Sequence, residues 1–388
     1  MSKILCPFCF EKTEVSQLEY RCSYTRCSGK REDVILAQAQ GLLSPTIEGL
    51  VFTPTKKGLG RLFGKSNQLE KCPNCNKETS IKVCPKCHYN LKYLSGEIEE
   101  KMIAIMGGRS SSKSTYISVL VNRLQNEIGK NFKAGVMFTD DKSRTIYEEI
   151  FRKPIFVREE ILQATVSSTV DSRAKTPMIL RVTFDNNGQR KAVNLVLFDT
   201  AGEDMEDIDI MSSEARYLCE ADGIIFILDP LQIETVRQLV KEDLPDRLES
   251  ADPNRIVERL YELHEQKLKI KAGKKIEKPI AFTLSKSDAL FPFIEADSVL
   301  HHSGEHFGYL NLPDVESVHT EICTYLEEWM GSAFDNKVKT YFNCYRYFAM
   351  SPLGKNPING KIEGLSPLRI EDPLLWLFSQ FQFIQGRK

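Results

Sequence analysis

Three short polar segments of the sequence each follow an apolar run, and their residue types suit the binding of phosphates and a base. The segments are 107–114 (GGRSSSKS), 199–202 (DTAG) and 285–288 (SKSD), after the apolar runs 102–106, 193–198 and 280–284. Continuous apolar runs of this length are typical of parallel strands buried on both faces. Ligands of open α/β sheets bind at the carboxyl ends of such strands. The three segments therefore predict one nucleotide site built from three loops.

The first segment resembles a Walker A phosphate loop. Such a loop turns successive backbone N–H groups toward an anion, and the helix that follows adds its positive N-terminal end. By this resemblance Lys113 reaches the β- and γ-phosphates, Ser114 ligates Mg²⁺ and Thr115 contacts the α-phosphate. Ser112 stands where glycine is usual, which predicts a strained loop. A solvated serine-rich turn is the alternative. The expected phosphate-binding residues are Gly107, Gly108, Arg109, Ser110, Ser111, Ser112, Lys113, Ser114 and Thr115.

The third segment resembles the guanine-binding motif NKxD, with Ser285 in place of the asparagine. A carboxylate at Asp288 can accept hydrogen bonds from N1–H and the 2-amino group of guanine, which adenine cannot supply in that pattern. Lys286 would lie along the base. Ser351, after the sixth expected strand, begins a segment (SPL) that weakly resembles the base-contacting SAK loop. A surface Lys–Asp pair is the alternative. In the second segment, Asp199 would hold Mg²⁺ through a water and the Gly202 N–H would meet the γ-phosphate.

Residues 100–388 resemble a TRAFAC-class GTPase, and the double-GTPase 2 group of bacterial conflict and signalling systems is closest. The resemblance rests on GGRSSSKST, LFDTAGED, the run at 225–230 (IFILDP), TLSKSD and the late segment 373–377 (PLLWL). It implies GTP or GDP with Mg²⁺ as ligands. It also implies an effector or a GAP-like protein as the partner.

The same resemblance supplies candidates for catalysis. Thr176 lies 23 residues before Asp199, which is the spacing of the Mg²⁺-binding switch threonine in Ras-like proteins. Residues 173–176 (RAKT) look like the Arg-x-Lys-Thr of heterotrimeric G-protein α subunits, which makes Arg173 a candidate arginine finger. A solvated loop arginine is the alternative. Glu203 occupies the position of the water-orienting glutamine and lacks the amide donor, so we expect slow or partner-dependent hydrolysis.

Eight cysteines of the first 87 residues have the spacing of structural zinc ligands. A two-residue gap lets both thiolates of a tight turn face one Zn²⁺, and four protein ligands leave no open position for catalysis. Grouped by nearness in sequence, they predict two sites. The first is Cys6, Cys9, Cys22 and Cys27, and the second is Cys72, Cys75, Cys84 and Cys87. Buried free thiols are the alternative. His88 adjoins the second set and is expected to be exposed.

Composition places the chain among ordinary globular proteins. Of 388 residues, 41% are hydrophobic and 27% are charged, with no apolar stretch long enough for a membrane helix and no secretory signal, which predicts a cytoplasmic protein. Residues 1–92 hold 15 Lys and Arg against 8 Asp and Glu. Eight thiolates on two Zn²⁺ would reduce this excess to about +3. Nucleic-acid binding is thus possible but not favoured.

These observations predict an α/β fold, a Ras-like P-loop GTPase domain with a mostly parallel sheet, preceded by two small zinc-ribbon modules. The expected divisions are ribbon 1 over 1–30, a connecting segment over 31–70, ribbon 2 over 71–95 and the GTPase domain over 96–388. Strands are expected at 101–106, 178–184, 192–198, 223–228, 279–284 and within 341–350, and helices at 113–128 and 373–384.

The function that follows is a GTP-binding switch of slow hydrolysis, with the ribbons docking a protein partner. Two alternatives stay open: a scaffold that nucleotide stabilises without turnover, and a nucleic-acid-associated GTPase that uses the basic glycine-rich loop over 56–65. Every expected phosphate and base contact lies beyond Lys101. Nucleotide affinity is therefore expected to be independent of residues 1–92.

Overall fold

A seven-stranded sheet forms the centre of the protein in a computed structural model. The structure describes residues 3–54, 69–91, 99–108, 110–162, 177–186, 189–197, 217–240, 244, 252–268 and 273–387. The strands of the central sheet are β10 (Glu99–Gly107), β11 (Ala134–Phe138), β12 (Met178–Asn186), β13 (Gln189–Leu197), β14 (Gly223–Leu228), β15 (Ile280–Leu284) and β17 (Tyr345–Ala349).

The strand order is β11-β12-β13-β10-β14-β15-β17. β13, β10, β14, β15 and β17 run parallel, whereas β12 and β11 are antiparallel to their neighbours. Every residue of β14 and β15 is buried, as expected of central parallel strands covered on both faces. The expected α/β class with a mostly parallel sheet is confirmed, and each of the six expected strands is present.

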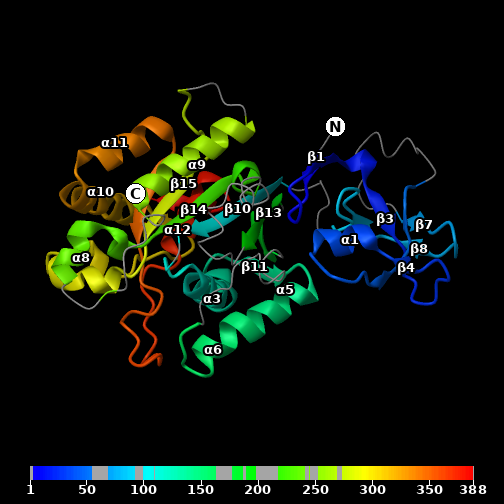
Figure 1. Cartoon of the computed structure of the whole chain (residues 1–388), viewed down its shortest axis with the longest axis horizontal. Coiled ribbons are helices and arrows are strands. Elements are labelled where there is room, and N and C mark those ends of the chain that lie inside the picture. Colours follow the sequence, from blue (N-terminus) through cyan, green and yellow to red (C-terminus); the bar gives the residue numbers. More distant parts are fainter. Residues whose placement is uncertain are drawn as a thin grey trace.

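Helices cover both faces of this sheet (Figure 1). α3 (Lys113–Arg123) follows the phosphate loop and continues through a π-helical stretch, Leu124–Ile128, into α4 (Gly129–Asn131). The expected late helix is α12, and all its residues from Asp372 to Phe378 are buried, so it packs into the core. α12 spans Asp372–Gln380. The other α-helices described beyond α4 are α5 (Asp141–Ile146), α6 (Lys153–Phe156), α8 (Glu234–Val240), α9 (Pro253–Leu268), α10 (Leu312–Met330) and α11 (Ser332–Tyr341).

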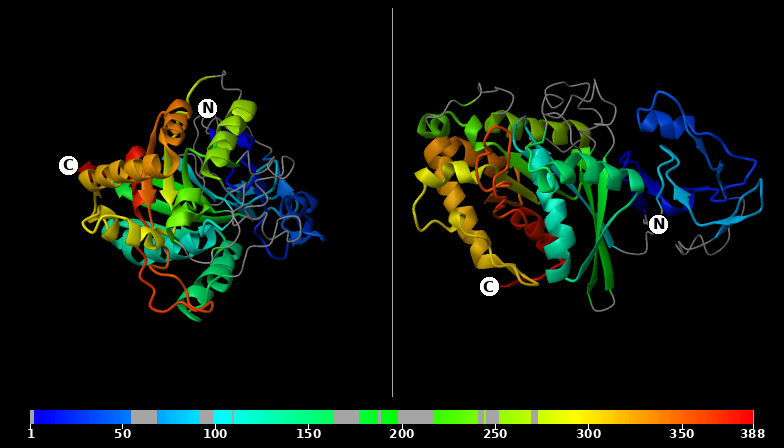
Figure 2. Two further views of the ribbon diagram at one scale, coloured as in Figure 1. Left: turned by 60° about the vertical axis from the view of Figure 1, so that its left-hand side comes forward. Right: turned by 90° about the horizontal axis from the view of Figure 1, so that it is seen from below.

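A cysteine-rich unit, residues 3–54 and 69–91, lies at one end of the molecule (Figures 1 and 2). Its three-stranded sheet has the order β6-β3-β9, so strands far apart in the chain pair with one another. Its elements are β1 (Lys3–Leu5), β2 (Lys12–Glu14), β3 (Glu19–Arg21), β4 (Arg31–Glu32), α1 (Val34–Ala39), β5 (Ile47–Glu48), β6 (Val51–Phe52), β7 (Glu70–Lys71), β8 (Glu78–Thr79) and β9 (Lys82–Val83).

The cysteine-rich unit shares its core with the domain of the seven-stranded sheet. Ile4, Phe8 and Leu91 belong to the same buried cluster as the central strands. Tyr89 stacks on Phe8 with ring centroids 4.9 Å apart, and its hydroxyl donates to Asp140 Oδ2 across 2.7 Å. The unit is therefore anchored directly on the larger domain.

Candidate functional site

The phosphate loop has the backbone of an anion nest. Ser110 and Ser112 both adopt left-handed conformations, with φ of 63° and 62°, and α3 begins at Lys113 directly after them. Such turns direct successive N–H groups into one concavity, and the helix N-terminus adds positive potential there. Lys113, the first residue of α3, is buried at 7% exposure. The arrangement suits a chain of phosphates.

Ser112 shows why this position usually carries glycine. Its φ of 62° and ψ of 22° lie in the left-handed region, where a Cβ atom costs about 1–2 kcal/mol. The predicted strain in the loop is therefore present in the backbone. Strain of this kind persists where the surrounding structure over-determines it, which is common at ligand clamps.

Gly107 and Ser111 show how tightly the loop is closed. A Cβ atom on Gly107 would lie 2.4 Å from the Ser111 Oγ and 3.1 Å from the Ile227 carbonyl oxygen, so a larger residue there would force the Ser111 hydroxyl to move. Ser111 is 2% exposed, and its hydroxyl has no hydrogen-bond partner among the described residues. A buried hydroxyl without a partner is an expected feature of a site completed by a polar ligand.

The second loop of the site follows β15, where the side chains of the SKSD segment meet different neighbours. Ser285 is fully buried and donates to the Leu228 carbonyl across 3.2 Å, which fastens the ends of β14 and β15 together. Lys286 is left-handed at φ 52°, and its Nζ lies 2.7 Å from Asp229 Oδ2. Asp229 was not among the expected site residues, although it also follows an apolar strand at its carboxyl end.

Asp288 is held by Ser351, the expected base-contacting residue with the weakest motif resemblance. The Ser351 hydroxyl donates to Asp288 Oδ1 across 2.5 Å and accepts from the Gly354 N–H across 2.9 Å. This leaves Oδ2 of Asp288 without a contact to Ser351. The ends of β15 and β17 therefore bring together Asp288 and Ser351, two of the residues that were assigned to the base from the sequence.

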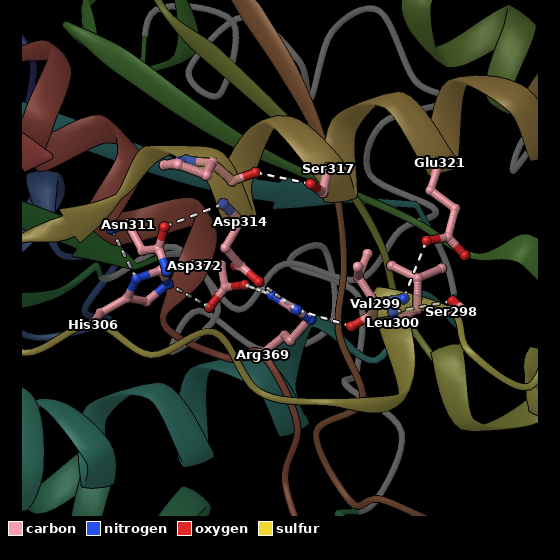
Figure 3. Close-up of polar contacts among 11 residues, drawn as sticks. Ser298, Val299, Leu300, His306, Asn311, Asp314, Ser317, Glu321, Arg369 and Asp372 are labelled. Atoms are coloured by element: carbon pink, nitrogen blue, oxygen red, sulfur yellow. Dashed lines mark hydrogen bonds and ion pairs between the residues drawn. The ribbon is translucent and has the colours of Figure 1, made fainter. Parts of the chain in front are cut away.

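Arg369 anchors the segment that pairs with Ser351. Leu368 and Ser351 exchange backbone hydrogen bonds of 2.9 and 3.0 Å. The next residue, Arg369, inserts its guanidinium between Asp314 and Asp372, with N···O distances of 2.9 and 2.7 Å (Figure 3). His306 Nε2 lies 3.3 Å from the other oxygen of Asp372. His306, Asp314 and Asp372 are close enough to share a metal ion, but Arg369 already forms ion pairs with both carboxylates, so the group is an ion-pair network.

Several expected site residues lie outside the described residues. They are Arg109, Arg173, Thr176, Asp199, Gly202 and Glu203. The site therefore rests on the phosphate loop, the SKSD segment and Ser351, and the Mg²⁺ and catalytic assignments remain predictions. Ser114 and Thr115, on the first turn of α3, are described and lie directly after Lys113.

The cysteines form two groups of four, and the grouping differs from the one expected from the sequence. The first cysteine cluster is Cys6, Cys9, Cys84 and Cys87, and the second cysteine cluster is Cys22, Cys27, Cys72 and Cys75. Grouping by nearness in sequence was wrong because spacing fixes which two thiolates share a turn but not which turns meet. The pairing of β3 with both β6 and β9 brings the two halves of the unit together.

The sulfur geometry fits zinc. Four thiolates about 2.3 Å from one tetrahedral ion lie about 3.8 Å from each other. The Sγ–Sγ distances are 3.7 Å for Cys6–Cys87, 3.6 Å for Cys9–Cys84, 3.6 Å for Cys22–Cys75 and 4.0 Å for Cys27–Cys72. Each cluster can therefore hold one Zn²⁺ with all four positions filled by protein.

The three CPxC turns share one backbone geometry. The residue after each second cysteine is left-handed, with φ of 57° at Phe10, 55° at Asn76 and 54° at His88. In each turn that residue donates its N–H to the carbonyl of the first cysteine, across 2.8–2.9 Å. His88 is not exposed as expected: its side chain is 13% exposed, with Nδ1 2.8 Å from Asp33 Oδ1.

Comparison with known proteins assigns the family. Residues 101–322 match the family described as Double-GTPase 2. The chain belongs to this family. Its phosphate loop and its SKSD segment, the two main described parts of the candidate site, both lie within the matched residues, and both cysteine clusters lie before them.

One curated relative of this double-GTPase is a protein of Mycolicibacterium smegmatis described as "Putative ESX-1 scaffolding and assembly protein SaeC". The two are 25% identical over 322 residues, which cover 78% of this chain and 80% of the relative. Within the part of this chain that the structure describes, no helix combines the length and the hydropathy needed to span a bilayer.

Proposed function

We propose that this chain is a guanine-nucleotide-dependent scaffold. It binds GTP with Mg²⁺, hydrolyses it slowly and assembles protein partners according to the nucleotide it holds. The observation that carries the proposal is the nest at Ser110 and Ser112 on the same edge of the sheet as Asp288, held by Ser351. Phosphates and a base would thus be met at the carboxyl ends of β10 and β15.

In this proposal Lys113 neutralises the phosphates and Asp288 selects guanine. Ser114, Thr176 and Asp199 would hold Mg²⁺. The ion would neutralise charge on the phosphates and help to orient them. Gly202 would contact the γ-phosphate and so report whether GTP or GDP is bound.

Calorimetric titration with GTP, GDP and ATP in the presence of Mg²⁺ tests the binding claim. Lys113→Ala should abolish measurable binding. Lys130→Ala, an exposed lysine beyond the end of α3, is the matched control and should bind as the wild type does. Equal affinity for ATP and GTP would remove the guanine assignment, and equal affinity of Lys113→Ala and the wild type would remove the phosphate assignment.

Turnover separates a switch from a scaffold that only needs nucleotide for stability. If Arg173 acts on charge that develops in the transition state, Arg173→Ala should lower kcat more than about tenfold and leave the GTP Kd within about threefold. Glu203→Gln should speed hydrolysis if the missing amide donor limits the rate. Phosphate release measured in single turnovers gives both values. A wild type without turnover would favour the stabilised scaffold.

The assembly role is supported by the relative from Mycolicibacterium smegmatis, whose description names scaffolding and assembly. Partner binding should depend on the nucleotide. Tagged protein loaded with GDP or with a non-hydrolysable GTP analogue should retain different amounts of the same partner, quantified by mass spectrometry against Lys113→Ala. Equal retention in all three samples would contradict the switch. Retention of nucleic acid that weakens steeply between low and physiological salt would favour the nucleic-acid alternative.

A further inference from the structure

Tyr217 has its hydroxyl between the phosphate-loop strand β10 and the neighbouring strand β13. The hydroxyl accepts from the Ile105 N–H across 2.8 Å and donates to the Val196 carbonyl. Ile105 lies opposite Leu197 in the parallel register of these strands. In that register the Ile105 N–H and the Val196 carbonyl face each other, so the hydroxyl lies within the hydrogen-bonding ladder of the sheet.

These contacts fall close to the candidate site. Ile105 is two residues before Gly107, where the phosphate loop begins, and Val196 is three residues before Asp199 in the sequence. A change in the position of the Tyr217 hydroxyl would therefore change the spacing of two strands directly behind the expected phosphates.

The ring of Tyr217 reaches the first cysteine cluster. Phe10 packs against it with ring centroids 5.5 Å apart and an interplanar angle of 48°. Phe10 follows Cys9 directly, and its left-handed backbone is closed by its N–H bond to the Cys6 carbonyl, at 2.9 Å. Four thiolates bound to one ion would fix the conformation of this turn. The metal would therefore determine the position of the Phe10 ring against Tyr217.

The backbone that follows Tyr217 is fixed by hydrogen bonds to the central sheet and to Lys278. Lys278 Nζ donates to the carbonyls of Leu218, Cys219 and Ala221 across 3.0, 2.7 and 2.8 Å. Asp222 Oδ2 accepts from the Met102 N–H across 2.8 Å. The backbone on the far side of Tyr217 is thus fixed to β10 and to a lysine two residues before β15. From the cysteine-rich unit, Phe10 packs on the ring of Tyr217, and Lys12 Nζ lies 2.5 Å from Glu220 Oε2 three residues further on.

We propose that Tyr217 is a positioning residue for the nucleotide site, and that the first cysteine cluster governs its position through Phe10. The proposal rests on the proposed function, because it needs a nucleotide at the phosphate loop. Coupling of this kind is reciprocal: metal in the first cysteine cluster raises nucleotide affinity by the factor by which nucleotide raises metal affinity. It replaces the expectation that nucleotide affinity is independent of residues 1–92.

The test uses the full chain with both metals bound. Tyr217→Phe removes only the hydroxyl and keeps the ring against Phe10, whereas Phe10→Leu changes the aromatic contact and keeps the hydroxyl. Phe52→Leu is the matched control, since Phe52 is an aromatic residue of the same unit that packs near the second cysteine cluster. Affinity for a fluorescent GDP analogue, its dissociation rate, zinc content and circular dichroism are measured for each variant, well below the unfolding temperature.

The expected result is that Tyr217→Phe and Phe10→Leu weaken nucleotide binding by about fivefold or more, with both zinc ions and the circular dichroism of the wild type retained. Phe52→Leu should bind as the wild type does. The double variant should lose less than the product of the two single losses, because the residues act through one contact. A merely structural role would lower the unfolding temperature and leave the dissociation rate unchanged.

Reciprocity supplies a second readout. Saturating GDP should slow the release of zinc to a chelator from Cys72→Ser, which keeps only the first cysteine cluster. It should have no effect on Cys84→Ser, which keeps only the second. Nucleotide binding by the wild type together with unchanged affinity in Tyr217→Phe and Phe10→Leu would overturn this inference alone. Failure of the wild type to bind any guanine nucleotide would instead overturn the proposed function.

Discussion

Ser351 holds Asp288 by a hydrogen bond of 2.5 Å from its hydroxyl to Oδ1, and these residues follow two adjacent strands of the sheet. The bond fixes the rotation of the carboxylate before any ligand arrives. An acceptor that is already oriented binds more tightly because less side-chain entropy is lost on binding. If Asp288 binds guanine as proposed, Ser351 would support that recognition.

Asp288→Asn should weaken GTP binding by at least about 3 kcal/mol, about 100-fold, because it removes a charged acceptor of two hydrogen bonds. Xanthine nucleotides should bind this variant better than GTP, since their 2-carbonyl can accept from the new amide. Ser351→Ala should cost about 1 kcal/mol, about fivefold, and keep the preference for guanine. Calorimetric titration measures both. Unchanged GTP affinity in Asp288→Asn would mean that the base lies elsewhere.

Ser112→Gly should stabilise the phosphate loop. Removing the Cβ relieves about 1–2 kcal/mol of left-handed strain in the folded state. Glycine also gives the unfolded chain more conformational freedom, which lowers the free energy of unfolding by about 0.4–1 kcal/mol. The net gain is up to about 1.6 kcal/mol in urea unfolding, accompanied by tighter binding of GDP. Ser112→Ala keeps the Cβ and serves as the control. A glycine variant no more stable than the alanine variant would show that the loop carries no such strain.

Double variants of the cysteines should distinguish the observed grouping from grouping by nearness in sequence. Cys6→Ser with Cys84→Ser should leave one zinc per chain, because both residues belong to the first cysteine cluster. Cys6→Ser with Cys72→Ser should leave none, because it breaks both clusters. Elemental analysis of protein purified without chelator gives the count. If Cys6→Ser with Cys84→Ser left no zinc, the sequential grouping would be restored.

Two buried histidines should give the folding stability opposite pH dependences. Burial alone would lower the pKa of His306, but its contact with Asp372 outweighs this and raises the pKa. The stability it contributes is therefore complete below its unfolded pKa of about 6.5 and is lost as the pH rises through the folded value. For His264, burial and the charge of Lys278 lower the pKa to about 4, so its contribution is complete above about 6.5 and is lost as the pH falls toward 4.

Urea unfolding of the wild type, His306→Gln and His264→Gln between about pH 4 and pH 9 measures these contributions as differences from the wild type. The difference for His306 should shrink as the pH rises, and that for His264 should shrink as the pH falls. Parallel curves for the two variants would contradict the assigned environments.

Most of the central sheet could be predicted because parallel strands buried on both faces are continuous apolar runs. The run at 102–106 and the run at 280–284 are examples, and both are strands. β11 was missed because it lies at the edge of the sheet and alternates between partly buried and exposed residues, which gives it no continuous apolar run. In the cysteine-rich unit, β5 and β6 are separated at Gly49, where a Cβ would lie 2.0 Å from the Cys22 carbonyl oxygen.

The parts of the candidate site that lie in one continuous segment could be predicted from the sequence. The parts that depend on tertiary contacts could not. The left-handed Ser112 follows from the phosphate-loop pattern alone. The Lys286–Asp229 pair, the anchoring of the Ser351 segment by Arg369 and the position of the Tyr217 hydroxyl each join residues distant in the sequence. The grouping of the cysteines failed for the same reason, since each CPxC turn is locally complete whichever turn it meets.

The interleaved cysteines set an order in which the chain can acquire its structure during synthesis. Cys6 and Cys87 are separated by 81 positions, so the first metal site cannot close until the whole cysteine-rich unit has left the ribosome. At about 5–20 residues per second, the first turn waits at least about 4 s as two unpaired thiolates. The cysteine-rich unit therefore depends on the zinc supply and on reducing conditions at the moment of translation. A chain made under zinc shortage would leave these thiols open to oxidation until metal binds.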